Sequence, residues 1–304
     1  MHIVGLGALN LDRLYKVPRI TKGDEEIAIL EAVEEPGGSA ANTIYALRKL
    51  GMSAGFIGAV GNDPEAKKVL GSLDKVGVDT SHIKIKANAQ TGLVIGIVDP
   101  QGERALYIAP NANNLLTYRD LDREHILGAD ILHMSSFVSD KQLEVQKKAV
   151  RMLNPVTKLS FAPGSLYVKK GLDAISPIIE RSHVLFINES EAKTLIGKEY
   201  ESVSNFLIDS GCKIVAVTLK DKGCFITDGN ESYHVEAVNK NVMDTTGAGD
   251  AFCAGFLFGL SQERKLRDCG LLGNIVAGRC ISKIGARSGL PKISELENTL
   301  AELI

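Results

Sequence analysis

The feature that most constrains the fold is a repeated alternation of short apolar runs with longer, helix-like stretches. Strand-sized apolar runs occur at residues 3–6, 54–57, 131–134, 184–187 and 214–218. Such runs are typical of strands buried on both faces, and helix-like sequence separates many of them. Because a helix between two strands returns the chain to the same edge of a sheet, this order predicts a parallel sheet wrapped by helices.

Two of the intervening helices can be delimited from their ends. The first begins at a capping Asp63 with Pro64 in its first turn, carries an apolar stripe, and stops at Gly77. The second covers about residues 40–50 and ends at Gly51. Both helices fit the α/β pattern.

Two regions break the alternation, at about residues 13–35 and 91–109. Their strand-like runs and turn residues predict a small, separate β-sheet. Because both leave the α/β body early in the chain, we expect them to meet as a lid over the strand ends, where open α/β sheets bind ligands. Residues 1–304 are therefore predicted to form one domain with an inserted lid.

Composition excludes several classes of protein. The chain has 304 residues, a formal net charge of −2 and a pI near 6.3, so it lacks the basic excess of a nucleic-acid binder. Its five cysteines are odd in number and form no Cys-x-x-Cys pair, which favours reduced thiols. No signal-like N-terminus or run of membrane-spanning length is present, so we expect a cytoplasmic protein with no membrane partner.

The strongest chemical signal is the run Asp244-Thr245-Thr246-Gly247-Ala248-Gly249-Asp250, which leads directly into an apolar helical stretch at 251–260. Glycines allow the backbone to turn its amides toward one point, and the start of the helix adds a positive dipole end. These features predict an anion hole at Gly247, Ala248, Gly249 and Asp250. No Gly-Lys-Ser/Thr ends the run, so it is not a Walker A loop.

Asp250 suggests what the anion hole is for. Phosphoryl transfer requires a positioned hydroxyl with a proton acceptor, charge stabilisation on the moving group, and a metal. A carboxylate beside an anion hole supplies the first two, so Asp250 is the candidate catalytic base. A lone Gly-x-Gly-Asp would more often be a simple helix cap above a turn.

Five motifs in order resemble the ribokinase-like, or PfkB, family of carbohydrate and nucleoside kinases: residues 37–42, 58–63, 188–191, 218–223 and 244–250. The resemblance covers nearly the whole chain. It implies a three-layer αβα sandwich with a mostly parallel central sheet and a small β lid. It also implies an ATP- and Mg²⁺-dependent kinase that phosphorylates a hydroxyl of a sugar or nucleoside.

The acceptor site is predicted from two segments. Asn42 lies on an otherwise apolar helix after a Ser39 cap, so its amide is expected to face a ligand, and Gly37 and Gly38 permit close approach. Asn10 and Asp12 follow the first strand and, by their spacing, share one face at the carboxyl edge of the sheet. By resemblance, Asp12 accepts hydrogen bonds from substrate hydroxyls; a solvated loop carboxylate is the alternative.

The nucleotide site is predicted at the ends of two later strands. Asn188 and Glu191 follow the run 184–187 and offer oxygen ligands to Mg²⁺, with Glu191 acting through water, although the pair also suits a capping box. Thr218 and Gly223 match the nucleotide-binding turn, though a plain strand exit would look similar. Asn274 matches a position near the base in the family.

A monovalent cation is also implied by the resemblance. Some relatives bind one beside the anion hole, and Asp244 and Thr246 match two of its ligands. We therefore expect K⁺ as a further ion.

Several positions depart from ribokinase itself. Ribokinase carries a glutamate near the segment that here is 133–137, which has no acid, and a lysine where this chain has Ser39. Residues 160–164 resemble the Phe-x-Pro-Gly stretch of archaeal-type nucleoside kinases. These differences favour a nucleoside over ribose. A phosphosugar would need a cationic cluster, for which Arg13, Lys16 and Arg104 are candidates, with solvated charges as the alternative.

We therefore predict an ATP-dependent phosphotransferase that acts on a sugar or nucleoside. A non-catalytic sugar or nucleotide sensor of the same fold is the main rival, and the intact Asp250 argues against it. A Rossmann oxidoreductase is excluded because Gly5-Leu6-Gly7 lacks the third glycine of the dinucleotide fingerprint. Exposed lid strands commonly need covering, so a homodimer through the lid is expected.

Overall fold

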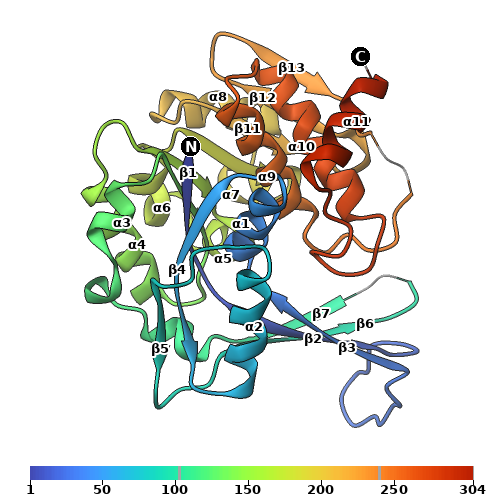
Figure 1. The fold of residues 1–304 in the computed structure, drawn as a ribbon. Helices are drawn as coiled ribbons and strands as arrows, with labels where there is room; N and C mark the ends of the chain where they lie inside the picture. The colour runs from blue at the N-terminus through green and yellow to red at the C-terminus, as the bar shows by residue number, and fades with distance from the viewer. Residues whose placement is uncertain (102–103, 239–240, 304) are drawn as a thin grey trace.

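A central sheet forms the middle layer of the molecule (Figure 1). The computed structural model describes residues 1–101, 104–238 and 241–303. Nine strands of this described part lie in the order β13-β12-β11-β10-β9-β8-β1-β4-β5. The strands are β1 (His2–Leu6), β4 (Ser53–Gly61), β5 (Ile83–Lys86), β8 (Ile131–Ser135), β9 (Lys158–Ala162), β10 (Val184–Asn188), β11 (Val215–Thr218), β12 (Cys224–Thr227) and β13 (Ser232–Val235).

The central sheet is mostly parallel. All of its pairings from β11 through to β5 are parallel, whereas β11, β12 and β13 pair antiparallel at one edge. The predicted α/β class is therefore confirmed, with an antiparallel addition at one edge that the alternation did not predict. The carboxyl ends of the parallel strands meet at one edge of the sheet, which is where ligands bind in such folds.

Helices cover both faces of the sheet and complete the three layers. One face carries α1 (Ser39–Lys49), α2 (Pro64–Asp74), α9 (Ala248–Ser261), α10 (Leu266–Cys280) and α11 (Ile293–Leu303). The other face carries α3 (Arg123–Leu127), α4 (Asp140–Met152), α5 (Gly164–Val168), α6 (Leu172–Ile179), α7 (Glu189–Ile196) and α8 (Tyr200–Asp209). Short 3₁₀ turns lie at Asn111–Leu115, Tyr118–Asp120 and Lys220–Lys222.

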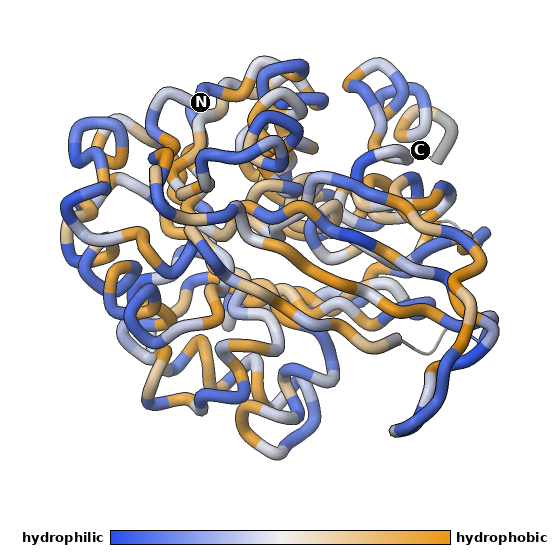
Figure 2. Tube along the Cα trace, turned by 90° about the horizontal axis from the view of Figure 1, so that it is seen from below, coloured by the Kyte–Doolittle hydropathy of each residue, from blue (hydrophilic) through white to orange (hydrophobic). Residues whose placement is uncertain are grey.

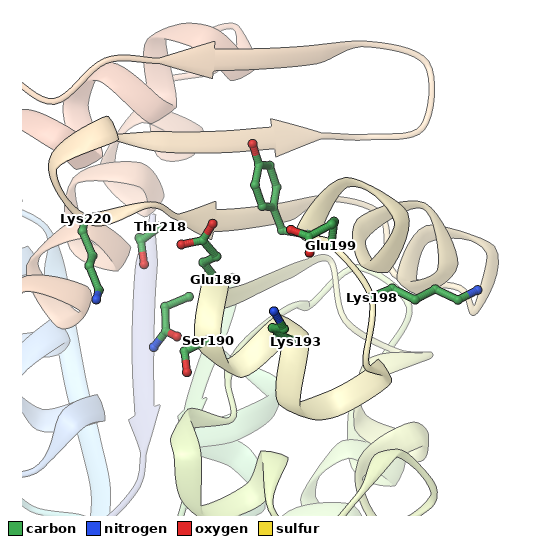
Figure 3. A pocket seen from close by; sticks show the side chains of 9 residues that line it. Glu189, Ser190, Lys193, Lys198, Glu199, Thr218 and Lys220 are labelled. Carbon is green, nitrogen blue, oxygen red and sulfur yellow. The ribbon is translucent and has the colours of Figure 1, made fainter.

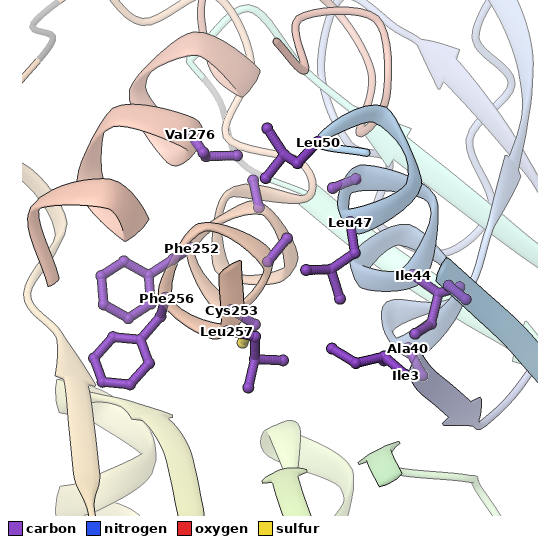
Figure 4. Packing of buried hydrophobic residues seen from close by; sticks show 14 of the residues in the cluster. Ile3, Ala40, Ile44, Leu47, Leu50, Phe252, Cys253, Phe256, Leu257 and Val276 are labelled. Atoms are coloured by element: carbon purple, nitrogen blue, oxygen red, sulfur yellow. The ribbon is translucent and has the colours of Figure 1, made fainter. Parts of the chain in front are cut away.

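Two buried apolar clusters explain why the strands read as unbroken apolar runs. Successive residues of a strand point to opposite faces, so Ile3 belongs to one cluster and Val4 to the other. In the first cluster, Leu47 of α1 lies beside the face of α9 that carries Cys253 and Leu257 (Figure 4). Burying each such side chain contributes about 1.5–3 kcal/mol. The contact between α1 and α9 brings the starts of both helices together.

The helix boundaries largely follow the predicted signals. Asp63 caps α2 by accepting a hydrogen bond from the Ala66 amide, and Pro64 is the first residue of the helix. The cap of α1 differs from the prediction: it is Gly38, at φ 109°, and Ser39 is already inside the helix. The Ser39 hydroxyl is therefore available for another contact.

A second, four-stranded sheet stands apart from the body, and we call it the small sheet (Figure 1). Its strands lie in the order β3-β2-β6-β7 and are β2 (Asn10–Lys16), β3 (Glu31–Gly37), β6 (Gly92–Val98) and β7 (Arg104–Ala109). Seen from below, apolar residues recur along these strands (Figure 2). The four strands come from the two regions that interrupt the α/β alternation.

The small sheet begins earlier than the sequence suggested. Asn10 and Asp12 were expected at the carboxyl edge of the main sheet, but both lie within β2. They pair there with Gly37 and Glu35 of β3 on one side and with Gly92 and Val94 of β6 on the other. Backbone bonds to both neighbours hold these residues in a strand, so the alternative of a solvated loop carboxylate at Asp12 is not what the structure has.

Candidate active site

Asp250 lies where the first turns of α1 and α9 meet. One of its carboxylate oxygens accepts a hydrogen bond from the Ser39 hydroxyl at 2.6 Å, and the other accepts one from the Asn42 side-chain amide at 2.9 Å. Thr43 donates to the Asp250 backbone carbonyl at 3.2 Å. Asn42, whose amide was expected to face a ligand, is therefore also hydrogen-bonded to Asp250.

Backbone geometry leaves amides exposed beside this carboxylate. Gly247, at φ 77°, is in the left-handed conformation that glycine adopts without strain, and it starts α9 without a side-chain cap. The first helical bond runs from Ala251 to Gly247, so the amides of Gly249 and Asp250 precede the helical pattern. The Ala248 amide, in contrast, donates to Thr245, which removes it from the predicted set of anion-hole donors.

The space beside Gly249 is open. A Cβ atom placed there would meet nothing within 4 Å, whereas one on Gly247 would overlap Ala286. The two glycines of the turn thus have different roles. Gly247 is required by conformation and packing, and Gly249 leaves room for a ligand at the uncapped end of α9, where an anion is favoured.

Arg287 is the residue that sequence analysis missed. It lies after α10, is only 9% exposed, and its Nε donates to the Asn42 side-chain oxygen at 2.9 Å. A further nitrogen donates to Ser72, and the guanidinium lies 4.8 Å from the centre of the Tyr45 ring. Its Nη2 is buried without a partner among the described residues. No sequence pattern around Gly285-Ala286-Arg287 marked it.

Two more carboxylates approach this centre from the small sheet. Burial raises the pKa of Asp12 to about 7, with Arg287 opposing the shift and the nearby charges of Asp250 and Glu35 adding to it. Burial and Asp244 raise the pKa of Glu35. Asp12 Oδ1 is buried and has no partner among the described residues. An unsatisfied acceptor and the unsatisfied donor of Arg287 are what hydroxyl groups of a ligand would satisfy.

The backbone near Asp12 is closely packed at Gly37, Gly38 and Asn10. A Cβ on Gly37 would overlap the Asp12 carboxylate, and one on Gly38 would overlap the Ala8 carbonyl. These two glycines therefore accommodate the protein's own groups, in addition to any ligand. Asn10 is buried, and its side-chain oxygen accepts a hydrogen bond from Asn113 at 2.9 Å.

The pKa of Asp250 suits a proton acceptor. Burial raises it to about 6, while the hydrogen bonds from Ser39 and Asn42 and the charge of Arg287 lower it. The group is therefore ionised at pH 7 yet more basic than an exposed aspartate. A pKa near the operating pH is favourable for a general base.

The predicted nucleotide residues meet at the ends of two neighbouring strands. Asn188 ends β10 and lies opposite Thr218, which ends β11. A groove of about 370 Å³ opens beside them (Figure 3), lined by Asn188, Glu189, Ser190, Lys193, Lys198, Glu199, Tyr200, Thr218 and Lys220. Three lysines against two glutamates leave this lining with one net positive charge, which suits phosphate.

Glu191 forms the capping box that its spacing from Asn188 suggested. Asn188 and Glu191 form a capping box at the start of α7, with each side chain accepting a hydrogen bond from the other's backbone amide at 2.9–3.0 Å. Burial raises the pKa of Glu191, and the charge of Asp250 adds to the shift. The capping box is therefore present, and the Glu191 carboxylate also interacts electrostatically with Asp250.

Two other nucleotide candidates have contacts within the protein. Gly223 has φ 89°, and a Cβ there would overlap the carbonyl of Val235. The Asn274 amide donates to the carbonyls of Val235 and Glu236 at 2.9 and 3.0 Å. Gly223 therefore allows the close approach of the chain leaving β13, and Asn274 holds that chain by two hydrogen bonds.

Asp244 and Thr246 form one connected unit. The Asp244 carboxylate accepts hydrogen bonds from the backbone and hydroxyl of Thr246 and from the Gly285 amide. The segment before the glycine turn is thereby tied to the segment that carries Arg287. Oxygen atoms gather here as a monovalent-cation site requires, but their present bonds are internal.

The remaining expectations concern the cationic residues of the small sheet. His133, in the segment that has no acid, is buried in the core and bonded to Ser160. Arg13 pairs with Glu34 and Glu65, and Lys16 pairs with Glu31. Their charges are thus already matched. The side chain of Arg104 lies outside the described part.

Comparison with known proteins decides the family. The chain matches the pfkB family carbohydrate kinases over residues 2–293. It belongs to the PfkB family. An uncharacterized sugar kinase of Archaeoglobus fulgidus is 35% identical over 81% of this chain and 98% of its own length. An ATP-dependent ribose-1-phosphate kinase of Halopiger xanaduensis is 32% identical over 95% of this chain and 94% of its own length.

Solved structures agree with this assignment. Ribokinase of Thermotoga maritima has a TM-score of 0.87 and 26% identity, covering 98% of this chain and 99% of that one. The ribokinase-like fold and the kinase class are therefore established: this PfkB protein is a phosphotransferase of the sugar and nucleoside kinase group, in a family that uses ATP. No helix in the described residues has the length and apolarity needed to cross a membrane.

Proposed function

We propose that this PfkB protein phosphorylates a hydroxyl of a neutral sugar or nucleoside, with Asp250 as the general base. The observation that carries the proposal is the Asp250 carboxylate beside the uncapped start of α9. It has a raised pKa, two side-chain donors that orient it, and open space at Gly249.

The chemistry follows from this arrangement. The acceptor hydroxyl oxygen attacks the terminal phosphorus of ATP while its proton passes to Asp250. The bond from that phosphorus to the bridging oxygen breaks, and ADP leaves. The amides of Gly249 and Asp250 and the helix dipole stabilise the negative charge on the moving group.

The residues present fit the nucleotide and its ions. ATP would place its phosphates between the uncapped start of α9 and the strand ends at Asn188 and Thr218, with Gly223 and Asn274 shaping the wall beyond. Mg²⁺, when bound, supplies charge neutralisation to the phosphates, and Glu191 would hold it through water. Asp244 and Thr246 would contribute to a K⁺ site. The small sheet would act as a lid that excludes water, the competing acceptor.

The acceptor is proposed to be neutral because of the charges already buried in the site. The carboxylates of Asp12, Glu35 and Asp250 lie close enough to interact electrostatically, and the guanidinium of Arg287 interacts with all three. A phosphate placed among these acids would be repelled unless Arg287 were committed to it. The Halopiger relative is named for a phosphorylated acceptor, ribose 1-phosphate, which would be a counter-example to a neutral acceptor. If this chain accepted such a phosphosugar, Arg287 would be the partner of its phosphate.

The test is Asp250→Asn measured in a coupled ADP-release assay. We expect turnover to fall by roughly two to four orders of magnitude, the range for loss of a general base, with nucleotide binding nearly unchanged. A variant with near-normal turnover would refute the role of Asp250. A screen of sugars, nucleosides and phosphosugars with ATP identifies the acceptor. If no acceptor stimulates ADP release, a sensor role gains support.

A further inference from the structure

A cluster of histidines and aspartates lies far from Asp250. Asp79 and His82 lie just before β5, and His125 lies on α3, which precedes β8. All three are therefore near the amino-terminal ends of the parallel strands, the edge opposite to the one where ligands bind in such folds. Each offers one ligand atom, and these atoms lie within 4.8 Å of one another.

His82 is held by a carboxylate on its other side. Its Nδ1 lies 3.1 Å from Oδ2 of Asp122, and its Nε2 lies 3.7 Å from Oδ2 of Asp79. A carboxylate on one ring nitrogen directs the other nitrogen outward and increases its basicity, which is the usual arrangement around metal-binding histidines. Asp79 is exposed, and its Oδ1 accepts hydrogen bonds from the amide and hydroxyl of Ser81, so Oδ2, which faces His82, is the oxygen that would meet an ion.

His125 supplies a ring nitrogen that the described part of the protein leaves without a partner. Its Nε2 is buried without a hydrogen-bond partner among the described residues. The neutral imidazole is the form that binds metals. The stacked rings of His82 and His125 lie beside the carboxylates of Asp79 and Asp122, so nitrogen and oxygen ligands are gathered at one place.

We propose that Asp79, His82 and His125 bind a divalent transition metal of the Zn²⁺ type. Two imidazoles and one carboxylate are ligands that Zn²⁺ accepts in a tetrahedral site, with water in the fourth position. Mg²⁺ and Ca²⁺ prefer oxygen alone, so they are disfavoured here. The ion would tie the loop before β5 to α3, and it would act on stability because it is remote from Asp250.

Binding requires one local movement. The rings of His82 and His125 are stacked with centroids 3.8 Å apart and planes at 18°. For both nitrogens to meet one ion, the ring edges must tilt toward each other. His82 is only partly buried, and the side chain of Asp79 is exposed, so these two residues adjust around the more confined His125.

The experiment is a Zn²⁺ titration of the full-length, metal-free chain, followed by calorimetry and by thermal unfolding. We expect one ion per chain, bound well below ~100 µM, and a rise in Tm on saturation. His82→Ala and Asp79→Ala should each abolish the rise. Asp122→Asn should weaken binding by roughly 10- to 100-fold, because it removes only the orienting carboxylate.

Controls separate this site from others on the chain. His234→Ala removes an exposed histidine on β13, at the other edge of the sheet, and should bind Zn²⁺ like the natural chain. A tenfold excess of Mg²⁺ should not displace the ion. His82→Ala, which avoids the more buried His125, keeps the test valid if His125 variants fail to fold. Unchanged binding in His82→Ala, or no binding at all, would overturn the proposal.

Discussion

At the scale of single residues, the proposed active site depends on Arg287. Its guanidinium fixes the oxygen of the Asn42 amide, so the nitrogen of that amide faces Asp250. Burial lowers the pKa of Arg287 to about 10, and the group remains charged at neutral pH. Arg287 therefore acts on Asp250 in two ways, through orientation and through charge.

Exchanging Arg287 should separate these two effects. Asp250 must be ionised to accept a proton, so kcat/KM is expected to fall as the pH drops through about 6. Because Arg287 lowers the pKa of Asp250, Arg287→Met should move this acidic limb to higher pH. Arg287→Lys keeps the charge and should leave the limb in place while lowering kcat.

The control for this pair is Arg48→Lys. Arg48 donates to the backbone carbonyls of Val76 and Met52, away from Asp250, so its exchange should leave the pH profile unshifted. A pH profile that is the same in Arg287→Met and the natural enzyme would show that Arg287 is purely structural. The measurement is steady-state kinetics between pH 5 and 9 with folding verified by circular dichroism.

A second residue-scale prediction concerns Gly249. Since a Cβ atom there meets nothing in the protein, Gly249→Ala should fold with normal stability. Its methyl group would occupy the space proposed for the phosphates, so kcat/KM should fall by at least about tenfold, or 1.4 kcal/mol of transition-state stabilisation. Gly71→Ala is the matched control, since Gly71 also has open space in the interior of α2. It should gain about 0.5–1 kcal/mol of stability with full activity.

At the scale of elements, α7 shows how one residue pair serves structure and chemistry together. The capping box of Asn188 and Glu191 satisfies two backbone amides at the start of the helix. This is worth roughly 0.5–2 kcal/mol. The same cap holds the Glu191 carboxylate rigidly near Asp250, so positioning the proposed magnesium ligand requires no further element.

Glu191→Gln distinguishes the cap from the metal role. Glutamine can also complete a capping box, so the free energy of unfolding should change by less than about 0.5 kcal/mol. Loss of the charge should raise the Mg²⁺ concentration for half-maximal activity by roughly 10- to 100-fold. The measurement is ADP release against Mg²⁺ concentration. An unchanged Mg²⁺ requirement would leave Glu191 as a helix cap only.

At the scale of the whole molecule, the small sheet has two open edges, β3 and β7. Leu106 and Tyr107 on β7 are 50% and 61% exposed. Open edges with apolar side chains tend to pair with another chain. These features support the proposed homodimer through the lid.

Leu106→Lys tests this association. A lysine on the edge strand should weaken the dimer because its charge would be buried between two sheets, and sedimentation velocity should show monomers. Phe206→Lys is the control, since Phe206 is an exposed apolar residue on α8, outside the small sheet. A natural chain that sediments as a monomer at all concentrations would contradict the proposal.

The sequence by itself determined the elements whose signals are local. Apolar runs predicted the buried strands because the period of a strand is expressed in neighbouring residues. Asp63 marks the start of α2 because capping acts within one turn. The helical run predicted at 251–260 is present as α9, which begins earlier, at Ala248. The order of the motifs then indicated the family.

Only the tertiary structure decided how these parts combine. Ser39 and Asp250 are 211 positions apart, and Asn42 and Arg287 are 245 apart, yet each pair shares a hydrogen bond. No local pattern carries such contacts, because they depend on how α1, α9 and the segment after α10 pack. Asp12 lies in a strand of the small sheet for the same reason, because its pairing partners, Glu35 and Val94, come from other parts of the chain.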